Sequence, residues 1–447
     1  MSRPRRTPNR DHARRTRSPD LASPAVEQHL TDLIAPATYA QMSSYRALGL
    51  RARLLTLPVM VALVLIMIWR HVASATDLVR LLAREQLLWL APLAQPPTQQ
   101  ALSARLRTFP AALFEQVLWD VVGPMHQRFA ARTRPLPPAV ERAQAHFAAV
   151  QVLDASTLEV LFRKVGLLRE AATPPLAGTL AAVIDLPSRL PTALWYDAAP
   201  QANEKRFSER FLATVGPQSL SIFDLGFFAF PFFDQFTERQ AFFLTRLRDK
   251  TAYTVEQVLE SSPHLRDRLV RLGVYRANPC VHPLRLIEVW HQGHWYTYLT
   301  NVLDPARLSA LDAADLYRRR WRIEEAFLIV KRLLDLAYLW VGAINGILLQ
   351  VWATWLLYAV LLDLCDAVAD HLHLPLDRIS VEMTFRGLYH FTVAYSQGKA
   401  TDPVRYLADP ANADLGIVKR LRQPRGQPPP PRPAPVALDT MLQHLNL

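Results

Sequence analysis

Two aspartates stand where the chain could hold a divalent cation. Asp154 and Asp224 each follow a short apolar run of the kind that forms a buried strand, Val-Leu before the first and Ile-Phe before the second. A carboxylate at the end of a buried strand is held rigidly at the sheet edge, where neighbouring strands can bring two of them within metal-bridging distance. Mg²⁺ prefers oxygen ligands and leaves its other positions to water and phosphate. The pattern therefore predicts a metal site at the ends of two strands.

A third carboxylate, Glu324, lies in a charged segment between Asp315 and Lys331 that is typical of an amphipathic helix. At about 100° per residue, Tyr317, Arg320, Glu324 and Lys331 fall within an arc of roughly 60° and share one face. A carboxylate among hydroxyl and cationic side chains suits DNA cleavage, because the cations neutralise phosphates and position the scissile bond. An apolar stripe about a quarter-turn away would pack on a sheet: Leu316, Ile323, Phe327, Val330 and Leu334.

Short apolar runs bounded by turn residues predict the strands that would position the aspartates. Helix-like stretches at 157–168 and 203–212 lie between them, so this region is predicted to be α/β with a buried sheet. A later pair of runs, 284–289 and 294–301, predicts a hairpin with Gly293 in its turn. The runs assigned to the sheet itself are Ala149–Leu153, Leu180–Ile184, Ala193–Tyr196, Ser219–Phe223 and Phe242–Leu247.

These residues carry a resemblance to a known family. The spacing Tyr-x2-Arg-x3-Glu-x6-Lys over 317–331 resembles the Tyr-Arg-Glu-Lys signature of the insertion sequence four family of DDE transposases at every position. Asp154–Thr157 is similar to the segment around that family's first aspartate, and Asp224–Phe227 to the segment around its second. The resemblance spans roughly 54–395, most of the chain.

The resemblance implies a fold and a reaction. It implies a ribonuclease-H-like catalytic core, interrupted before Glu324 by a β-rich insertion. Asp154, Asp224 and Glu324 would hold two Mg²⁺ or Mn²⁺ ions, one activating the attacking water or 3′-hydroxyl and the other stabilising the leaving oxygen. The expected activity is cleavage at the ends of an insertion sequence and strand transfer into target DNA. A homodimer on paired DNA ends is implied as well.

The resemblance also implies where DNA would bind. Tyr317, Arg320 and Lys331 would contact phosphates near the cut. Trp290 or Trp295 could stack on a flipped base, the alternative being ordinary packing within the hairpin. The segment 98–107 is predicted to be a helix capped by its threonine, whose polar side chains would either enter a groove of a terminal inverted repeat or form a solvated face. These side chains are Gln99, Gln100, Ser103, Arg105 and Arg107.

Changes in composition divide the chain. Seven arginines among the first twenty residues predict a disordered basic tail. The expected fold class is mixed α/β, with an all-helical DNA-binding domain ahead of the core. The expected boundaries are 1–23 for the tail, 24–138 for the helical domain, 139–248 for the first part of the core, 249–310 for the insertion, 311–400 for the second part of the core and 401–447 for a Pro-rich tail.

The bulk charge favours a polyanionic partner. A net charge of +12 and a pI near 9.9 suit nucleic acid or an anionic membrane surface, and charge alone does not choose between them. The two cysteines, Cys280 and Cys365, are too far apart for a zinc pair and indicate no disulfide framework. A cytoplasmic, bacterial nucleoid-associated protein is the expectation.

Two apolar segments raise the question of a membrane. The run 57–69 is shorter than the roughly 20 residues that span a bilayer, and we interpret it as a buried helix. The run 344–365 is long enough but carries Asn345, Gln350 and Asp363, so a core helix is favoured over a span and no membrane partner is expected.

Other interpretations stay open. Either aspartate alone is also typical of a turn. Asp185 and Asp234 are rival carboxylates for which structural roles are expected. The chain could be a related metal-dependent nuclease or an inactive relative that binds DNA. It could also be a helical DNA-binding or membrane-associated protein whose acidic residues are incidental.

Overall fold

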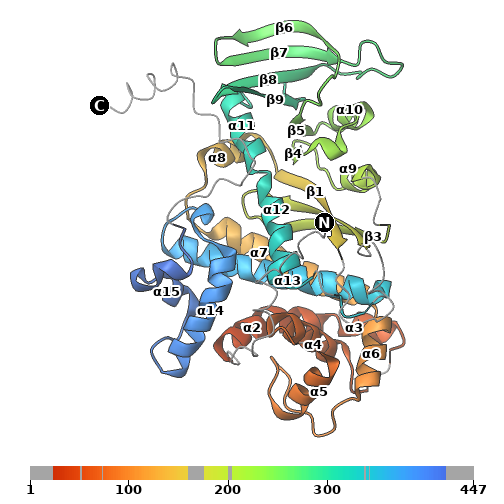
Figure 1. The fold of residues 1–447 in the computed structure, drawn as a ribbon, viewed down its shortest axis with the longest axis vertical. Coiled ribbons are helices and arrows are strands. Elements are labelled where there is room, and N and C mark those ends of the chain that lie inside the picture. Colours follow the sequence, from red (N-terminus) through yellow and green to blue (C-terminus); the bar gives the residue numbers. More distant parts are fainter. Residues whose placement is uncertain are drawn as a thin grey trace, which may run out of the picture.

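A single sheet of nine strands organises the part of the chain that the computed structural model describes, with helices packed around it (Figure 1). The described residues are 24–50, 53–72, 74–159, 176–199, 204–336, 339–341 and 343–418. The expected basic tail at 1–23 and the Pro-rich stretch at 423–435 lie outside them. The architecture is mixed α/β, as the sequence predicts.

Five strands form the half of the sheet that carries the aspartates. Their order is β3-β2-β1-β4-β5; β2 runs antiparallel to β1 and β3, whereas β1, β4 and β5 are parallel. This is the arrangement of a ribonuclease-H-like core. The strands are β1 (Val150–Glu159), β2 (Leu176–Asp185), β3 (Pro191–Asp197), β4 (Leu220–Phe223) and β5 (Phe242–Arg246).

The first strand is longer than predicted. A helix was expected from residue 157, but Thr157 and Leu158 belong to β1, because Ser156 and Thr157 pair with Leu180 and Thr179 of β2. The remainder of that expected helix, 160–168, lies outside the described residues. Hydrogen bonds to a neighbouring strand thus override the local helical pattern.

The predicted β-rich insertion continues the same sheet. The edge of β5 pairs with β9, so the order runs on as β9-β8-β7-β6. The predicted hairpin is confirmed, with Gly293 in the left-handed region at φ 85° in its turn. Buried Arg285 binds Asp267 across β7 and β8 and donates to the carbonyl of Leu308 at 2.7 Å. The strands are β6 (Tyr253–Ser261), β7 (Leu265–Leu272), β8 (Leu284–His291) and β9 (His294–Thr300).

Helix α13 (Ile344–His371) is the central helix of the fold (Figure 1). It is long and apolar enough to cross a membrane. However, 94% of its apolar 18-residue stretch is buried inside the protein. N-terminal helices α4, α6 and α7 pack against it. This is the core-helix arrangement that the sequence favours. The N-terminal helices are α2 (Pro24–Ala40), α3 (Met42–Ala47), α4 (Leu57–Trp69), α5 (Ala75–Arg84), α6 (Gln99–Thr108) and α7 (Ala111–Ala131).

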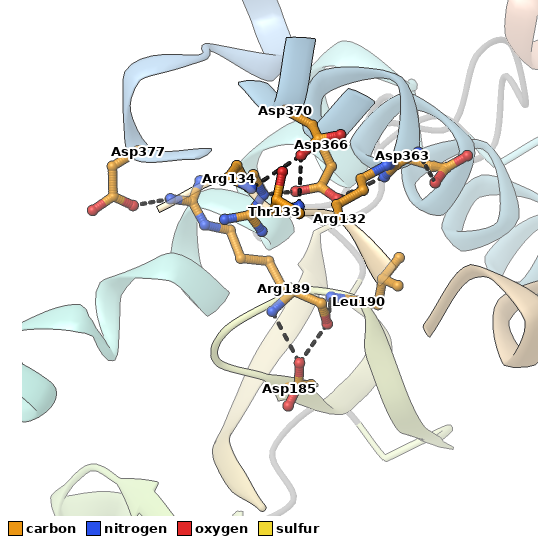
Figure 2. A network of polar contacts seen from close by, with 11 residues as sticks. Arg132, Thr133, Arg134, Asp185, Arg189, Leu190, Asp363, Asp366, Asp370 and Asp377 are labelled. Atoms are coloured by element: carbon orange, nitrogen blue, oxygen red, sulfur yellow. Dashed lines mark hydrogen bonds and ion pairs between the residues drawn. The ribbon is translucent and has the colours of Figure 1, made fainter. Parts of the chain in front are cut away.

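The Pro-rich connector after α7 is bound to α13 by ion pairs (Figure 2). Arg132 reaches both Asp363 at 2.9 Å and Asp366 at 2.6 Å, and Arg134 also pairs with Asp366. The backbone N–H groups of Thr133 and Arg134 donate to Asp370. The acidic residues on this apolar helix therefore fasten the N-terminal helices to the core.

The remaining helices flank the sheet and α13. Part of the region expected to be a tail is structured, because α15 packs on α13 and α14. They are α8 (Pro138–His146), α9 (Ser208–Leu212), α10 (Phe230–Glu238), α11 (Ala310–Arg319), α12 (Trp321–Leu328), α14 (Val381–Ser396) and α15 (Pro403–Ala408).

Candidate active site

Asp154 and Asp224 lie at the same level on adjacent parallel strands. Leu153 of β1 is paired with Phe223, the last residue of β4, and each aspartate is the next residue. Asp224 ends its strand, as predicted. Asp154 does not, because β1 continues to Glu159 alongside β2. The prediction of a strand end is therefore wrong for Asp154, but the register brings the two aspartates side by side.

Asp224 is held in place from behind by a cluster of phenylalanines. Its Oδ1 accepts a hydrogen bond from Gly226 N at 2.8 Å and caps a short 3₁₀ turn, Leu225–Phe227. Phe223 packs on Phe243 with ring centroids 5.8 Å apart, and both rings are fully buried. Such aromatic pairs fix the strand end because each ring fills a large volume in a defined geometry.

Arg320 joins Asp154 to Glu324. Its Nη1 donates to Oδ2 of Asp154 at 2.9 Å and its Nη2 donates to Oε1 of Glu324 at 2.8 Å. Arg320 and Asp154 are both buried, whereas about a third of the Glu324 side chain is exposed. The guanidinium forms this bridge because Arg320 lies between α11 and α12, facing β1.

The three carboxylates are close enough for their charges to influence one another. Burial raises the pKa of Asp154 to about 7; Arg320 lowers it, and the charges of Asp224 and Glu324 raise it. The same carboxylates hold the pKa of Arg320 above its ordinary value despite burial. The region thus favours positive charge next to these acidic groups.

The residues fit a hard divalent cation by donor chemistry, since all three offer carboxylate oxygens. Within the described ranges, however, no three acidic, histidine or cysteine side chains are arranged to hold a metal ion. Arg320 supplies the positive charge between Asp154 and Glu324 instead. A cation shared by these two groups would compete with that guanidinium for their oxygens.

Comparison with known proteins gives one family match, in the central region of the chain. Residues 177–351 match the family model described as "Transposase DDE domain". The matched residues include Asp224 and Glu324 and begin after Asp154.

Among solved structures, the chain is similar to that in a cryo-EM structure of the piggyBac transposase synaptic complex with hairpin DNA. The two share 10% sequence identity over 94% of this chain and 90% of that chain, with a TM-score of 0.40. No curated protein matches.

The charged helix of the candidate site is interrupted rather than continuous. Helix α11 ends at Arg319, α12 begins at Trp321, and a π-helical turn at 329–333 carries Lys331. Lys331 nevertheless reaches the first strand, where its Nζ donates to Ser156 Oγ and to the carbonyl of Thr157. These acceptors lie two and three residues beyond Asp154, so Lys331 is beside the candidate site.

Tyr317 lies on the same side of the helix as Arg320. The Arg320 guanidinium carbon is 5.9 Å from the centre of the Tyr317 ring, which also packs on Tyr298. Burial raises the pKa of Tyr317, which keeps its hydroxyl protonated. Arg320 and Lys331 therefore contact β1, whereas Tyr317 lies next to Arg320 and packs on β9.

The residues expected to bind DNA outside this edge differ in their surroundings. Gln99 is exposed at the start of α6, after the predicted threonine cap, whose Oγ1 accepts from Ala101 N. Arg105 is half-buried; it donates to the Tyr45 hydroxyl at 3.4 Å and stacks on Phe109. Arg105 is thus engaged within the protein.

The two tryptophans considered for base stacking pair with each other. Trp290 and Trp295 are opposite each other on β8 and β9, with ring centroids 5.4 Å apart. Arg266 stacks on Trp295 at 4.3 Å. Both indoles are half-buried, and a role in stacking on a flipped base stays a prediction.

The rival carboxylates have structural roles, as expected. Asp185 accepts hydrogen bonds from Ser188 in the turn after β2. Asp234 accepts from the backbone N–H groups of Val281 and His282 and from the Cys280 thiol. None of these hydrogen bonds connects Asp185 or Asp234 to a residue of the candidate site.

Three charged residues near the candidate site were not singled out by sequence. Arg246, the last residue of β5, and Arg248 are both exposed, and Arg248 donates to the carbonyl of Leu225 at 3.0 Å. Burial and, to a smaller extent, the charge of Asp224 raise the pKa of Glu204 to about 7, although Arg320 lowers it. Glu204 stands in a polar stretch whose sequence carries no signal for chemistry, so only its neighbours reveal it.

Proposed function

We propose that the chain is a DDE transposase of the insertion sequence four type. It would cleave DNA at the ends of an insertion sequence and transfer the freed strand into target DNA. The observation that carries the proposal is the Arg320 bridge between Asp154 and Glu324, with Asp224 at the same level on the next strand. The transposase DDE domain match across 177–351 supports the reaction class.

The proposed metal ligands are Asp154, Asp224 and Glu324. Two Mg²⁺ or Mn²⁺ ions bound there would supply Lewis-acid activation of the attacking oxygen and stabilisation of the leaving oxygen. The strand register supports this assignment for the aspartates, because adjacent parallel strands hold both carboxylates rigidly. Rigid placement matters because phosphoryl transfer depends mainly on positioning and electrostatics.

The cationic side chains would hold the DNA backbone. Arg246 and Arg248 are exposed near Asp224, and Lys331 lies beside β1. Tyr317 and Arg320 would contact phosphates near the cut. Phosphate contacts fix the position of DNA on a protein without reading its sequence. Recognition of the terminal inverted repeats is assigned to the N-terminal helices, including Gln99, and synapsis to a homodimer.

The test is a cleavage and strand-transfer assay with the flanking element ends, in Mg²⁺ and in Mn²⁺. Glu324→Gln keeps the size of the side chain and removes its charge. We expect at least about 100-fold loss of both steps. Glu325→Gln is the matched control, since Glu325 is the adjacent carboxylate and pairs with Arg322 instead.

The outcomes separate the alternatives. Equal activity of wild type and Glu324→Gln would remove the catalytic assignment. Cleavage without joining would indicate a related nuclease. Salt-dependent DNA binding that is unchanged by Asp224→Ala, with no cleavage by the wild type, would indicate a binding module.

A further inference from the structure

The carboxylate of Glu204 lies against the backbone that positions Asp224. A Cβ built on Gly226 would stand 1.6 Å from Oε2 of Glu204 and 3.0 Å from Oδ1 of Asp224. The two carboxylates therefore face each other across the one residue of this turn that has no side chain. Any other residue at position 226 would displace the Glu204 carboxylate.

Glu204 is positioned by the packing of the turn that it begins, and no ion pair to it is formed within the part of the chain that the structure describes. Glu204 begins a 3₁₀ turn that ends at Phe207, and this turn contacts the turn that follows Asp224. Phe207 and Phe211 are fully buried in the phenylalanine cluster that supports Asp224. Glu204 itself is half-buried, so its carboxylate is held in place and remains accessible to solvent.

The charges around Glu204 leave room for a cation. Asp224 and Arg320 are the charged groups that act on it. Arg320, however, is ion-paired with Asp154 and Glu324. Two carboxylates placed close together repel each other unless a cation lies between them. A divalent ion on Asp224 would relieve that repulsion and gain another oxygen ligand.

We propose that Glu204 is a fourth carboxylate of the cation site, binding directly or through water the divalent ion held by Asp224. This rests on the proposed function, and it assigns a role to a residue outside the three-carboxylate set. Gly226 is then required because its missing side chain admits the Glu204 carboxylate. Glu204 acts on the bound ion and does not transfer a proton in this proposal.

The test measures Mn²⁺ affinity of the full chain by calorimetry and by the electron paramagnetic resonance signal of free Mn²⁺. We expect Glu204→Gln to lower the affinity for the Mn²⁺ ion bound at Asp224 by roughly 10-fold or more. Glu209→Gln is the matched control, because Glu209 is an exposed acidic residue on the adjoining helix. Thermal midpoints without Mn²⁺ should be equal in all three proteins, since a purely structural role would shift them.

Gly226→Ala provides the second variant, because it displaces the Glu204 carboxylate while keeping its charge. We expect a similar loss of Mn²⁺ affinity, and little further loss when it is combined with Glu204→Gln. If Gly226→Ala weakens Mn²⁺ binding equally in the wild type and in Glu204→Gln, it acts through Asp224 and the proposal is wrong.

A third variant separates this proposal from the proposed function. If Asp224→Asn abolishes Mn²⁺ binding and Glu204→Gln leaves it unchanged, the three-carboxylate site stands and the role of Glu204 is refuted. If Asp224→Asn also leaves Mn²⁺ binding unchanged, both proposals are refuted.

Discussion

Arg320 donates a hydrogen bond from Nη1 to Oδ2 of Asp154 at 2.9 Å, although the two residues are 166 positions apart in the sequence. Both side chains are about 9% exposed. The guanidinium therefore neutralises a buried carboxylate in the absence of metal. We expect a bound metal ion to replace Arg320 as the partner of the Asp154 carboxylate.

The first prediction concerns that exchange. Arg320→Ala leaves Asp154 and Glu324 without their partner, and removing one member of a buried pair costs about 3 to 5 kcal/mol. We expect the unfolding free energy to fall by an amount near the lower end of this range. The reason is that Asp154, with its pKa raised to about 7 mainly by burial, can take up a proton. Urea unfolding with and without Mg²⁺ measures both effects, and Mg²⁺ should stabilise the variant more than the wild type.

Arg318→Ala is the control for this experiment. Arg318 pairs with Asp315 near the surface, and exposed pairs contribute about 0 to 1 kcal/mol. Equal Mg²⁺ stabilisation of wild type and Arg320→Ala would show that the guanidinium and the metal do not share these carboxylates.

The second prediction concerns pH. Burial would raise the pKa of Asp377, but Arg189, Arg322 and Arg319 lower it well below its ordinary value. A depressed folded-state pKa stabilises the protein above the unfolded-state value of about 3.9, and this stabilisation is lost as pH falls below it. Asp377→Asn should lower the unfolding free energy by about 3 to 5 kcal/mol at neutral pH, because three arginines lose a buried partner.

Unfolding curves across a pH series measure this effect. The difference between wild type and Asp377→Asn should shrink as the pH falls from about 5 to 2. Asp249→Asn, at an exposed position, should follow the wild type throughout. A difference that stays constant with pH would mean that Asp377 stabilises the fold by packing alone.

The third prediction concerns the phosphate contacts. Arg246→Ala and Arg248→Ala should each weaken DNA binding regardless of sequence, and each should reduce the slope of log K against log salt by about 1. Arg239→Ala is the control, because this exposed arginine precedes β5 and so lies at the opposite end of that strand. Fluorescence anisotropy at several salt concentrations measures the slopes, and an equal slope for all proteins would place the DNA elsewhere.

The fourth prediction separates two residues of α6. Arg105→Ala should lower stability by about 1 kcal/mol, since its guanidinium stacks on Phe109 and bonds Tyr45. Gln99→Ala should change stability by less than about 0.5 kcal/mol, because Gln99 is exposed. If α6 enters a groove, Gln99→Ala should weaken binding to the element end by about 1 to 3 kcal/mol and leave binding to unrelated DNA unchanged. Equal binding of wild type and Gln99→Ala to the element end would exclude that groove contact.

The sequence by itself determined the chemical character of this protein. Local patterns carry that information, because a strand or an amphipathic helix repeats its apolar residues at a fixed period. The runs before Asp154 and Asp224, the spacing from Tyr317 to Lys331 and the apolar length of α13 were all visible without coordinates. The break between α11 and α12 and the extension of β1 were not, since packing and strand pairing overrode local propensity.

Only the tertiary structure decided which charged groups meet. The Arg320 bridge, the approach of Glu204 to Asp224 and the joining of β9 to β5 each connect segments far apart in the chain. Such contacts follow from strand order and side-chain packing, and they leave no periodic trace in the sequence. Three carboxylates and Arg320 could thus be named from the sequence, whereas the bridge from Arg320 to Asp154 and Glu324 and the approach of Glu204 to Asp224 required the fold.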